Sequence, residues 1–197
     1  DRGLDYTKEA IPVSKTKAST GFHTDSTAKE YSPDIVGLLC LQPGRKGGES
    51  LLVNGADLYC WMHDNQPMYL PLLGDQIVRD VITPGTINNK ETILNNKFPI
   101  FSFDGVGIRF RYMRYWIITG HEKTGTPLQE ELQEAMNHID NYLNDEANCF
   151  NLKLSRGDML FVNNRFLCHN RTAYEDWKEE DKKRTMVRTW INSPNSN

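Results

Sequence analysis

Short apolar segments follow one another along most of the chain, separated by turns rich in proline, glycine or asparagine. Segments of this length with such boundaries are typical of β-strands. Alternation of apolar and polar residues at 101–103 and 108–112 predicts strands with one polar face. Further strands are predicted at 50–53, 152–154 and 185–191. The segments 35–41 and 159–162 are wholly apolar, so these two strands are expected to be buried. The segment 77–96 is predicted as strand, turn and strand.

Helical spacing is clearest at 127–143, where apolar residues recur every three or four positions. Thr126 is expected to cap this helix, and Pro127 suits its first turn. A shorter helix is expected at 56–64. Many short strands with one main helix predict a mainly β fold with flanking helices, either an all-β barrel or a double-stranded β-helix (jelly roll, cupin-like).

Composition narrows the class of protein. The 197 residues are enough for a single domain, 1–197, and 192–197 are expected to form a flexible tail. A net charge of −3 gives no electrostatic reason to expect nucleic acid or a membrane surface, and no apolar run approaches the ~20 residues of a membrane span. The cysteines form no CxxC pair, so we interpret them as buried reduced thiols and expect a cytoplasmic protein; they are Cys40, Cys60, Cys149 and Cys168.

The stretch GFHTDS places His23 and Asp25 two residues apart, on the same side of an extended segment. The pair is either half of a metal site or two polar residues in a loop. A third ligand is sought among the other histidines. His169 follows a predicted strand that can carry it to the mouth of a barrel, whereas the remaining histidines are expected at the surface or in satisfied positions; these are His63, His121 and His138. Two histidines and one carboxylate form a facial triad that suits nonhaem Fe(II).

Two arginines, Arg184 and Arg188, lie four residues apart in the last predicted strand and therefore share a face. A buried guanidinium is costly unless it meets an anion, and its planar fork pairs well with a carboxylate. The alternative is that either arginine lies along the surface of an edge strand.

With these residues identified, the chain resembles the TauD/TfdA-like group of Fe(II)- and 2-oxoglutarate-dependent dioxygenases, including the clavaminate-synthase-like hydroxylases. The matching motifs, in order, are FHTDS, DIVGLLCLQPGRKGGESLLVNG, RGDMLFVNNRFLCHNRT and KRTMVRTWI. The resemblance implies that His23, Asp25 and His169 bind Fe(II), and that Ser50 and Arg184 hold 2-oxoglutarate. It further implies that Arg188 contacts an anionic group of the substrate or the near end of the cosubstrate, with O2 as the other reactant.

Several positions depart from the pattern of this group. Asn163-Asn164 stands where Asp-Asn is common, and Asn170 replaces a common glycine after the distal histidine. Members usually have a longer region before the HxD motif, so part of the N-terminal region is expected to be missing from 1–197. The middle, 61–150, matches loosely, so substrate identity is not carried over. Related halogenases have a small residue at the position of Asp25, so its carboxylate favours hydroxylation or another oxidative outcome, such as desaturation or cyclisation, over halogenation.

The resulting expectation is an oxygenase that hydroxylates an unactivated C–H bond of a small substrate with an anionic group, such as an amino acid or a metabolite derived from one. Its coproducts are succinate and CO2. Neither nucleic acid nor membrane is expected as a partner, and the oligomeric state is left open. Two alternatives remain: a metal-dependent hydrolase using the same triad, and a noncatalytic jelly-roll binding protein.

Overall fold

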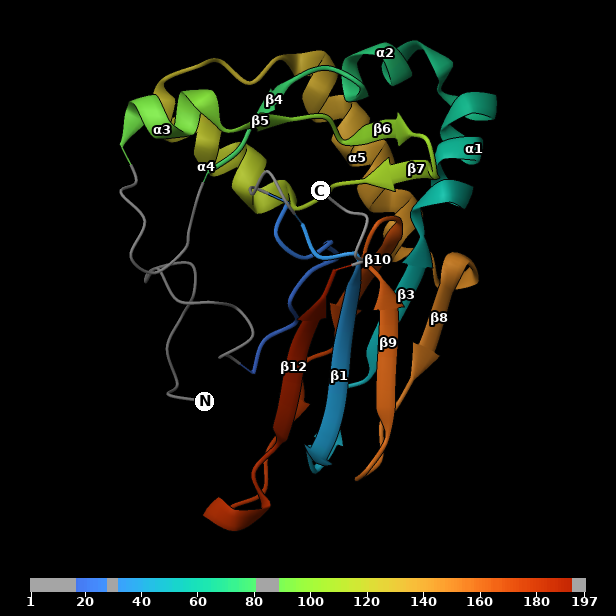
Figure 1. The fold of residues 1–197 in the computed structure, drawn as a ribbon, viewed down its shortest axis with the longest axis vertical. Coiled ribbons are helices and arrows are strands. Elements are labelled where there is room, and N and C mark those ends of the chain that lie inside the picture. The colour runs from blue at the N-terminus through green and yellow to red at the C-terminus, as the bar shows by residue number, and fades with distance from the viewer. Residues whose placement is uncertain (1–16, 28–31, 81–88, 193–197) are drawn as a thin grey trace.

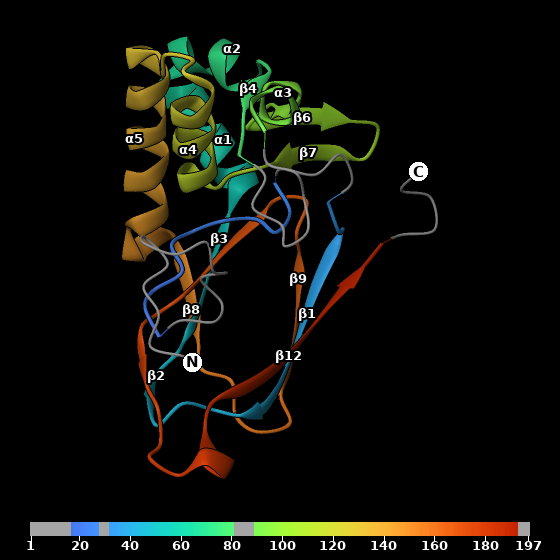
Figure 2. The same cartoon turned by 90° about the vertical axis from the view of Figure 1, so that its left-hand side faces the viewer.

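The computed structural model describes residues 17–27, 32–80 and 89–192, so all of the expected tail except Asn192 lies outside the described residues. Two three-stranded antiparallel sheets stand opposite each other, and helices cover one end of both (Figures 1 and 2). The strand orders are β12-β1-β9 and β10-β3-β8. The predicted mainly β jelly roll with flanking helices is therefore confirmed.

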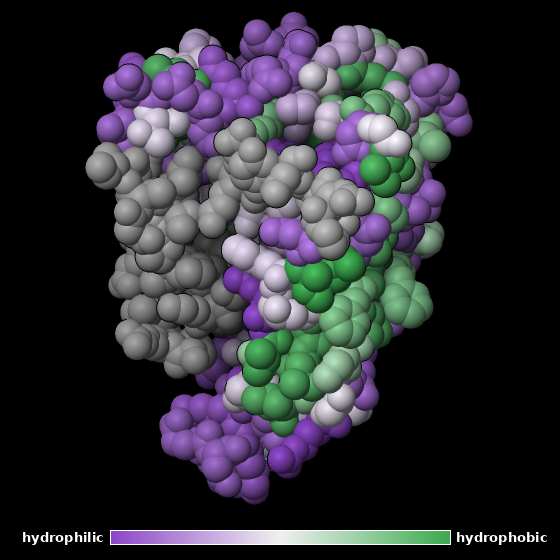
Figure 3. Space-filling view, in the orientation of Figure 1, coloured by the Kyte–Doolittle hydropathy of each residue, from purple (hydrophilic) through white to green (hydrophobic). Residues whose placement is uncertain are grey.

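The first sheet consists of β1 (Ile35–Gln42), β9 (Met159–Asn163) and β12 (Thr185–Ile191). Val36 lies between Val162 and Trp190 in register, and alternate residues face the other sheet. The prediction that 159–162 is wholly buried is wrong, since Met159 and Phe161 are 63% and 58% exposed. The outer face of this sheet is an exposed apolar surface (Figure 3); its exposed side chains include Leu41, Met159, Phe161, Val187 and Ile191.

The second sheet consists of β3 (Ser50–Asn54), β8 (Cys149–Leu152) and β10 (Leu167–Arg171). β8 begins three residues earlier than the predicted strand at 152–154 and ends at Leu152. Three short antiparallel pairs complete the strands: β2 (Lys46–Gly47) with β11 (Tyr174–Glu175), β4 (Ile77–Val78) with β5 (Lys97–Phe98), and β6 (Phe101–Asp104) with β7 (Gly107–Phe110). The β6-β7 hairpin confirms the alternation in the sequence.

The helices are α1 (Gly55–Asn65), α2 (Leu70–Leu73), α3 (Lys90–Asn95), α4 (Arg114–Thr124) and α5 (Glu130–Asn144), with 3-10 turns at Pro67–Tyr69, Glu146–Asn148 and Glu180–Lys182. The predicted short helix is confirmed as α1, and the Asn54 side chain caps it by accepting from the Ala56 N–H at 2.9 Å. The sequence pattern did not predict α4.

The main predicted helix exists but begins later than expected. α5 starts at Glu130, and Thr126 does not cap it. The Thr126 N–H instead donates to the carbonyl of His121, following Gly125 in the left-handed conformation (φ 67°). Thr126 therefore completes the C-terminal cap of α4.

The second half of the segment 77–96 is helical, so the predicted strand–turn–strand is wrong there. Asn89 caps α3 by accepting from the Thr92 N–H at 2.8 Å. A single side-chain cap favours the helix over the β-branched composition of this short segment. Residues 81–88, the middle of the predicted unit, lie outside the described residues.

One apolar cluster joins α1, α2, α4 and α5 to the β6-β7 hairpin and to β3 and β10. Cys40 and Cys168 are buried as expected, whereas Cys60 is exposed and Cys149 is half-buried, so that prediction holds for two cysteines only. No helix in the described ranges is both long and apolar enough to cross a membrane.

Ile139 lies on the inner face of α5 and is 0% exposed. We expect Ile139→Ala to lower the free energy of unfolding by about 2–5 kcal/mol, because a buried cavity replaces packed methylene groups. Val106→Ala is the control, since Val106 is 83% exposed and its truncation should change stability by less than about 0.5 kcal/mol. Urea unfolding measures both, and equal midpoints for the two variants would contradict the proposed core.

Candidate metal centre and adjoining cavity

Two histidines far apart in the sequence form one backbone pair. The N–H of His23 donates to the carbonyl of His169, and the N–H of His169 donates to the carbonyl of His23, both at 2.9 Å. Residues paired in this way in an antiparallel ladder project their side chains to the same face. The two imidazole centroids are accordingly 4.5 Å apart.

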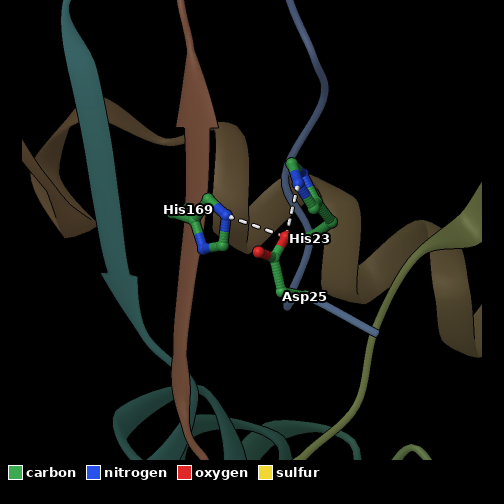
Figure 4. Close-up of side chains that lie close together, drawn as sticks. All are labelled: His23, Asp25 and His169. Carbon is green, nitrogen blue, oxygen red and sulfur yellow. Dashed lines mark ion pairs between the residues drawn. The ribbon is translucent and has the colours of Figure 1, made fainter. Parts of the chain in front are cut away.

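Asp25 completes the group, two residues along the extended segment from His23. Its Oδ1 lies 3.7 Å from Nε2 of His23 and 3.6 Å from Nε2 of His169 (Figure 4). One ligand atom from each residue lies within 4.8 Å of the others. The structure thus brings together the three predicted ligands in an arrangement that fits a divalent ion bound on one side, with its other coordination positions open.

The protonation states suit a cation. His23 Nδ1 lies 2.9 Å from the carbonyl of Gly21, which only accepts, so Nδ1 carries the proton and the Nε2 lone pair faces Asp25. Burial, followed by the charge of His169, lowers the pKa of His23 to about 4. Burial alone would raise the pKa of Asp25, but the hydrogen bond and charge of His169, with the charges of His23 and Arg188, hold that pKa well below its usual range. Near pH 7 the site presents a neutral imidazole and an ionised carboxylate.

The backbone around Asp25 is fixed by a buried amide that the sequence did not single out for this role. Asn164 is 3% exposed and its Oδ1 accepts from the Asp25 N–H at 2.7 Å. Its Nδ2 donates to the carbonyls of Asp25 and Pro33 at 3.1 and 2.9 Å. The only sequence signal was the asparagine pair at the end of a strand shortly before His169.

The other oxygen of Asp25 faces the opposite sheet. Trp190 Nε1 donates to Oδ2 at 2.7 Å, and Arg188 Nη1 lies 3.2 Å from the same atom. Arg188, predicted to face an anion of the substrate or cosubstrate, therefore also contacts a predicted metal ligand. Trp190 was missed, although its spacing of two residues from Arg188 in a strand places both on one face.

A cavity of about 520 Å³ opens beside the triad, between the two sheets. Its apolar wall includes Val36, Leu38, Leu160 and Val162 of the first sheet. Ser50, Arg184 and Arg188 line the same cavity as His23 and His169, so all the predicted cosubstrate and substrate residues share one space. Asp25 is nearly buried, at 5% exposure, and contacts three residues that line the cavity: His23, His169 and Arg188.

Cations gather at one end of this cavity. The guanidiniums of Arg171 and Arg184 lie over the ring of Tyr174, at 4.9 and 5.2 Å from its centroid. Burial lowers the pKa of Arg184, so its charge is incompletely solvated and an anion would stabilise it. A Cβ at Gly48 would lie 3.3 Å from Nε of Arg184, and Gly48 has a φ of 78°. The glycine pair before Ser50 therefore allows the turn to pass close to the arginine.

Asn170 has a defined role in place of the expected glycine. Its Oδ1 accepts from the hydroxyls of Ser19 and Thr20 at 3.1 and 3.0 Å. The Thr20 N–H donates to the carbonyl of Arg171 at 3.2 Å. These bonds hold the segment before His23 alongside β10, so the departure strengthens the local arrangement.

Comparison with known proteins gives consistent matches. The model of the family "Taurine catabolism dioxygenase TauD, TfdA family" matches residues 3–190. FR-33289 synthase of Streptomyces rubellomurinus (strain ATCC 31215) is 26% identical over 196 residues, which are 97% of this chain and 56% of that protein. Gamma-butyrobetaine dioxygenase of Homo sapiens is 24% identical over 169 residues, 85% of this chain and 43% of that protein. The chain thus spans about half the length of these relatives.

Among solved structures, asparagine oxygenase in complex with Fe(II), 2S,3S-3-hydroxyasparagine and succinate superimposes with a TM-score of 0.68. The match covers 93% of this chain and 55% of that chain at 18% sequence identity. At this identity the likeness shows the shared fold, and it agrees with the two-sheet architecture described above.

Asn164→Ala should lower the free energy of unfolding by about 1–3 kcal/mol, because the Asp25 N–H and the Pro33 carbonyl lose their buried partner. Asn151→Ala, at an exposed position of β8, is the matched control and should be nearly neutral. Chemical denaturation compares them. A stable Asn164→Ala variant with unchanged amide exchange at Asp25 would refute this role.

Proposed function

We propose, from the premise that the chain belongs to the taurine catabolism dioxygenase TauD, TfdA family, that it is an Fe(II)- and 2-oxoglutarate-dependent oxygenase. It hydroxylates an unactivated C–H bond of a small substrate with an anionic group, releasing succinate and CO2. The observation that carries the proposal is the convergence of His23, Asp25 and His169 beside a cavity. The donor set is that of nonhaem iron oxygenases.

In this proposal Nε2 of both histidines and Oδ1 of Asp25 hold the metal. Bound Fe(II), with 2-oxoglutarate and O2, supplies the oxidising power for C–H cleavage. The chain itself orients the ligands: Gly21 sets the tautomer of His23, and Asn164 holds the backbone of Asp25. The apolar wall of the cavity limits water near the metal, which favours reaction with substrate over side reactions.

In this proposal 2-oxoglutarate binds between the triad and the cationic end of the cavity. Arg184 pairs with its distal carboxylate, and the hydroxyl of Ser50 donates to the same group. A bidentate guanidinium–carboxylate pair is both directional and strong in a partly buried site. The lowered pKa of Arg184, caused by burial, supports this role, because a carboxylate would stabilise the partly desolvated cation.

The substrate class is an amino acid or a derivative of one. The support is the similarity to proteins whose names include asparagine oxygenase and gamma-butyrobetaine dioxygenase. Arg188 is the residue proposed to receive the anionic group of the substrate, because it lines the cavity next to Asp25. We further propose that residues 1–197 form one catalytic domain.

The cellular setting belongs to the same proposal. The four cysteines are free, which agrees with a reducing compartment such as the cytoplasm. The net charge of −3 favours a small-molecule substrate over nucleic acid or a membrane surface as partner.

His169→Ala should reduce 2-oxoglutarate-dependent succinate formation by more than about 100-fold, because one of three metal ligands is lost. The assay contains Fe(II), ascorbate, 2-oxoglutarate and O2, with free amino acids screened for an added mass of one oxygen. His63→Ala, which removes an exposed histidine beside Asp64, should retain wild-type turnover. Metal-dependent hydrolysis without 2-oxoglutarate would favour the hydrolase alternative, and failure to bind Fe(II) would favour the noncatalytic one.

Arg184→Gln should raise the KM for 2-oxoglutarate by about 10–100-fold, because a charge-assisted bidentate contact is lost. The kcat at saturating 2-oxoglutarate should fall much less. Arg156→Gln, at an exposed turn before β9, is the control. If both variants gave the wild-type KM, Arg184 would not hold the cosubstrate.

A further inference from the structure

The two carboxylate oxygens of Asp25 have different surroundings. Oδ1 faces the Nε2 atoms of His23 and His169, at 3.7 and 3.6 Å, and lies 3.5 Å from Arg188 Nη1. Oδ2 faces away from the imidazoles toward β12, where it accepts from Trp190 Nε1 at 2.7 Å and from Arg188 Nη1 at 3.2 Å. The side chain is buried, at 5% exposure, so these donors replace water on Oδ2.

We propose that Trp190 is a positioning residue of the metal centre: its indole N–H holds Oδ2 so that Asp25 offers Oδ1 alone to the ion. This inference rests on the proposed function, because it takes the triad to be the metal site. A carboxylate binds a metal through one oxygen or through both. Chelation through both would fill a coordination position that cosubstrate or O2 needs.

The position of Trp190 supports a polar role for its side chain. Met186, Arg188 and Trp190 alternate along β12 with residues of the outer face, so all three share the face toward Asp25. Trp190 is 45% exposed, so burial of its ring is incomplete, yet its single polar atom reaches a nearly inaccessible carboxylate. A tryptophan at a boundary commonly uses its N–H in this way.

Arg188 also donates to Oδ2, but this contact is weaker than the hydrogen bond from the indole. Its contact with Oδ2 is longer, at 3.2 Å, and its guanidinium carbon lies 5.2 Å from the centroid of the Trp190 ring. Arg188 also lines the cavity, so substrate binding competes for its nitrogens. Trp190 therefore supplies the shorter and more directional of the two restraints on the carboxylate.

Two substitutions of Trp190 test the effect of the N–H and the effect of the ring independently. Trp190→Phe keeps an aromatic ring and removes the donor. Trp190→Gln removes the ring but places an amide N–H the same number of bonds from Cβ as the indole nitrogen. Trp177→Phe, at an exposed tryptophan beyond β11, is the matched control.

The probe is Mn(II) added alone to the metal-free chain, with water-proton relaxation measured on the saturated complex. Relaxivity follows the number of waters bound to the ion. In Trp190→Phe, Oδ2 keeps only the longer contact with Arg188, so it should displace one of three waters from the ion and lower the inner-sphere relaxivity by about a third. Trp190→Gln and Trp177→Phe should keep the wild-type value.

A wild-type relaxivity in Trp190→Phe would overturn the proposed role of the N–H. If the relaxivity fell in Trp190→Gln and not in Trp190→Phe, the ring would act through packing instead. Thermal unfolding of each variant identifies any loss of fold. If the wild-type chain itself bound no Mn(II) or Fe(II), the proposed function would fail first, which distinguishes the two results.

Discussion

Two backbone hydrogen bonds between His23 and His169 set the geometry on which the candidate site depends. They make the segment before Asp25 an extra partner of β10, on the side opposite β3. Since such a pair directs both side chains to one face, the backbone pairing brings the imidazoles together. The Thr20 N–H extends the same pairing by donating to the carbonyl of Arg171, so main-chain hydrogen bonds hold the backbone of both histidines.

Asp25 is the costly member of the group, because a buried carboxylate loses its hydration. The structure offsets this loss at both ends of the residue. Asn164 satisfies its backbone N–H and carbonyl, while Trp190 and Arg188 supply donors to the outer oxygen. The inner oxygen faces the two histidines, with Arg188 Nη1 at 3.5 Å from it. A binding site of this kind needs such supporting contacts, since small displacements of a ligand atom weaken metal binding.

The cavity lies between the inner faces of the two sheets. Their facing sides enclose the cavity, where an apolar wall gives way to arginines near the turn that contains Gly47 and Gly48. Both glycines have positive φ, and a Cβ at Gly47 would collide with the carbonyl of Ala173. The turn can therefore approach β11 closely enough to bring Ser50 and Arg184 to one cavity.

The sequence by itself determined the mainly β class, α1, α5, the strands β6 and β7, and the members of the triad. These follow from local periodicity and from residue types whose chemistry is specific. It did not determine that Asn89 begins a helix, that Thr126 belongs to the end of α4, or that only alternate residues of β9 are buried. In α3 and at Thr126 a capping hydrogen bond outweighs the composition and spacing of the segment, and in β9 the uncovered outer face of the sheet does so.

The same distinction holds for the site. His23, Asp25 and His169 could be identified from the sequence because imidazole and carboxylate are recognisable ligands at recognisable positions. The supporting roles of Asn164 and Trp190 depended on the tertiary structure, because an amide or an indole acquires such a role only through the partner that folding places beside it. The sequence specifies the chemistry of each side chain, whereas contacts between distant segments form only when strands pair and sheets pack.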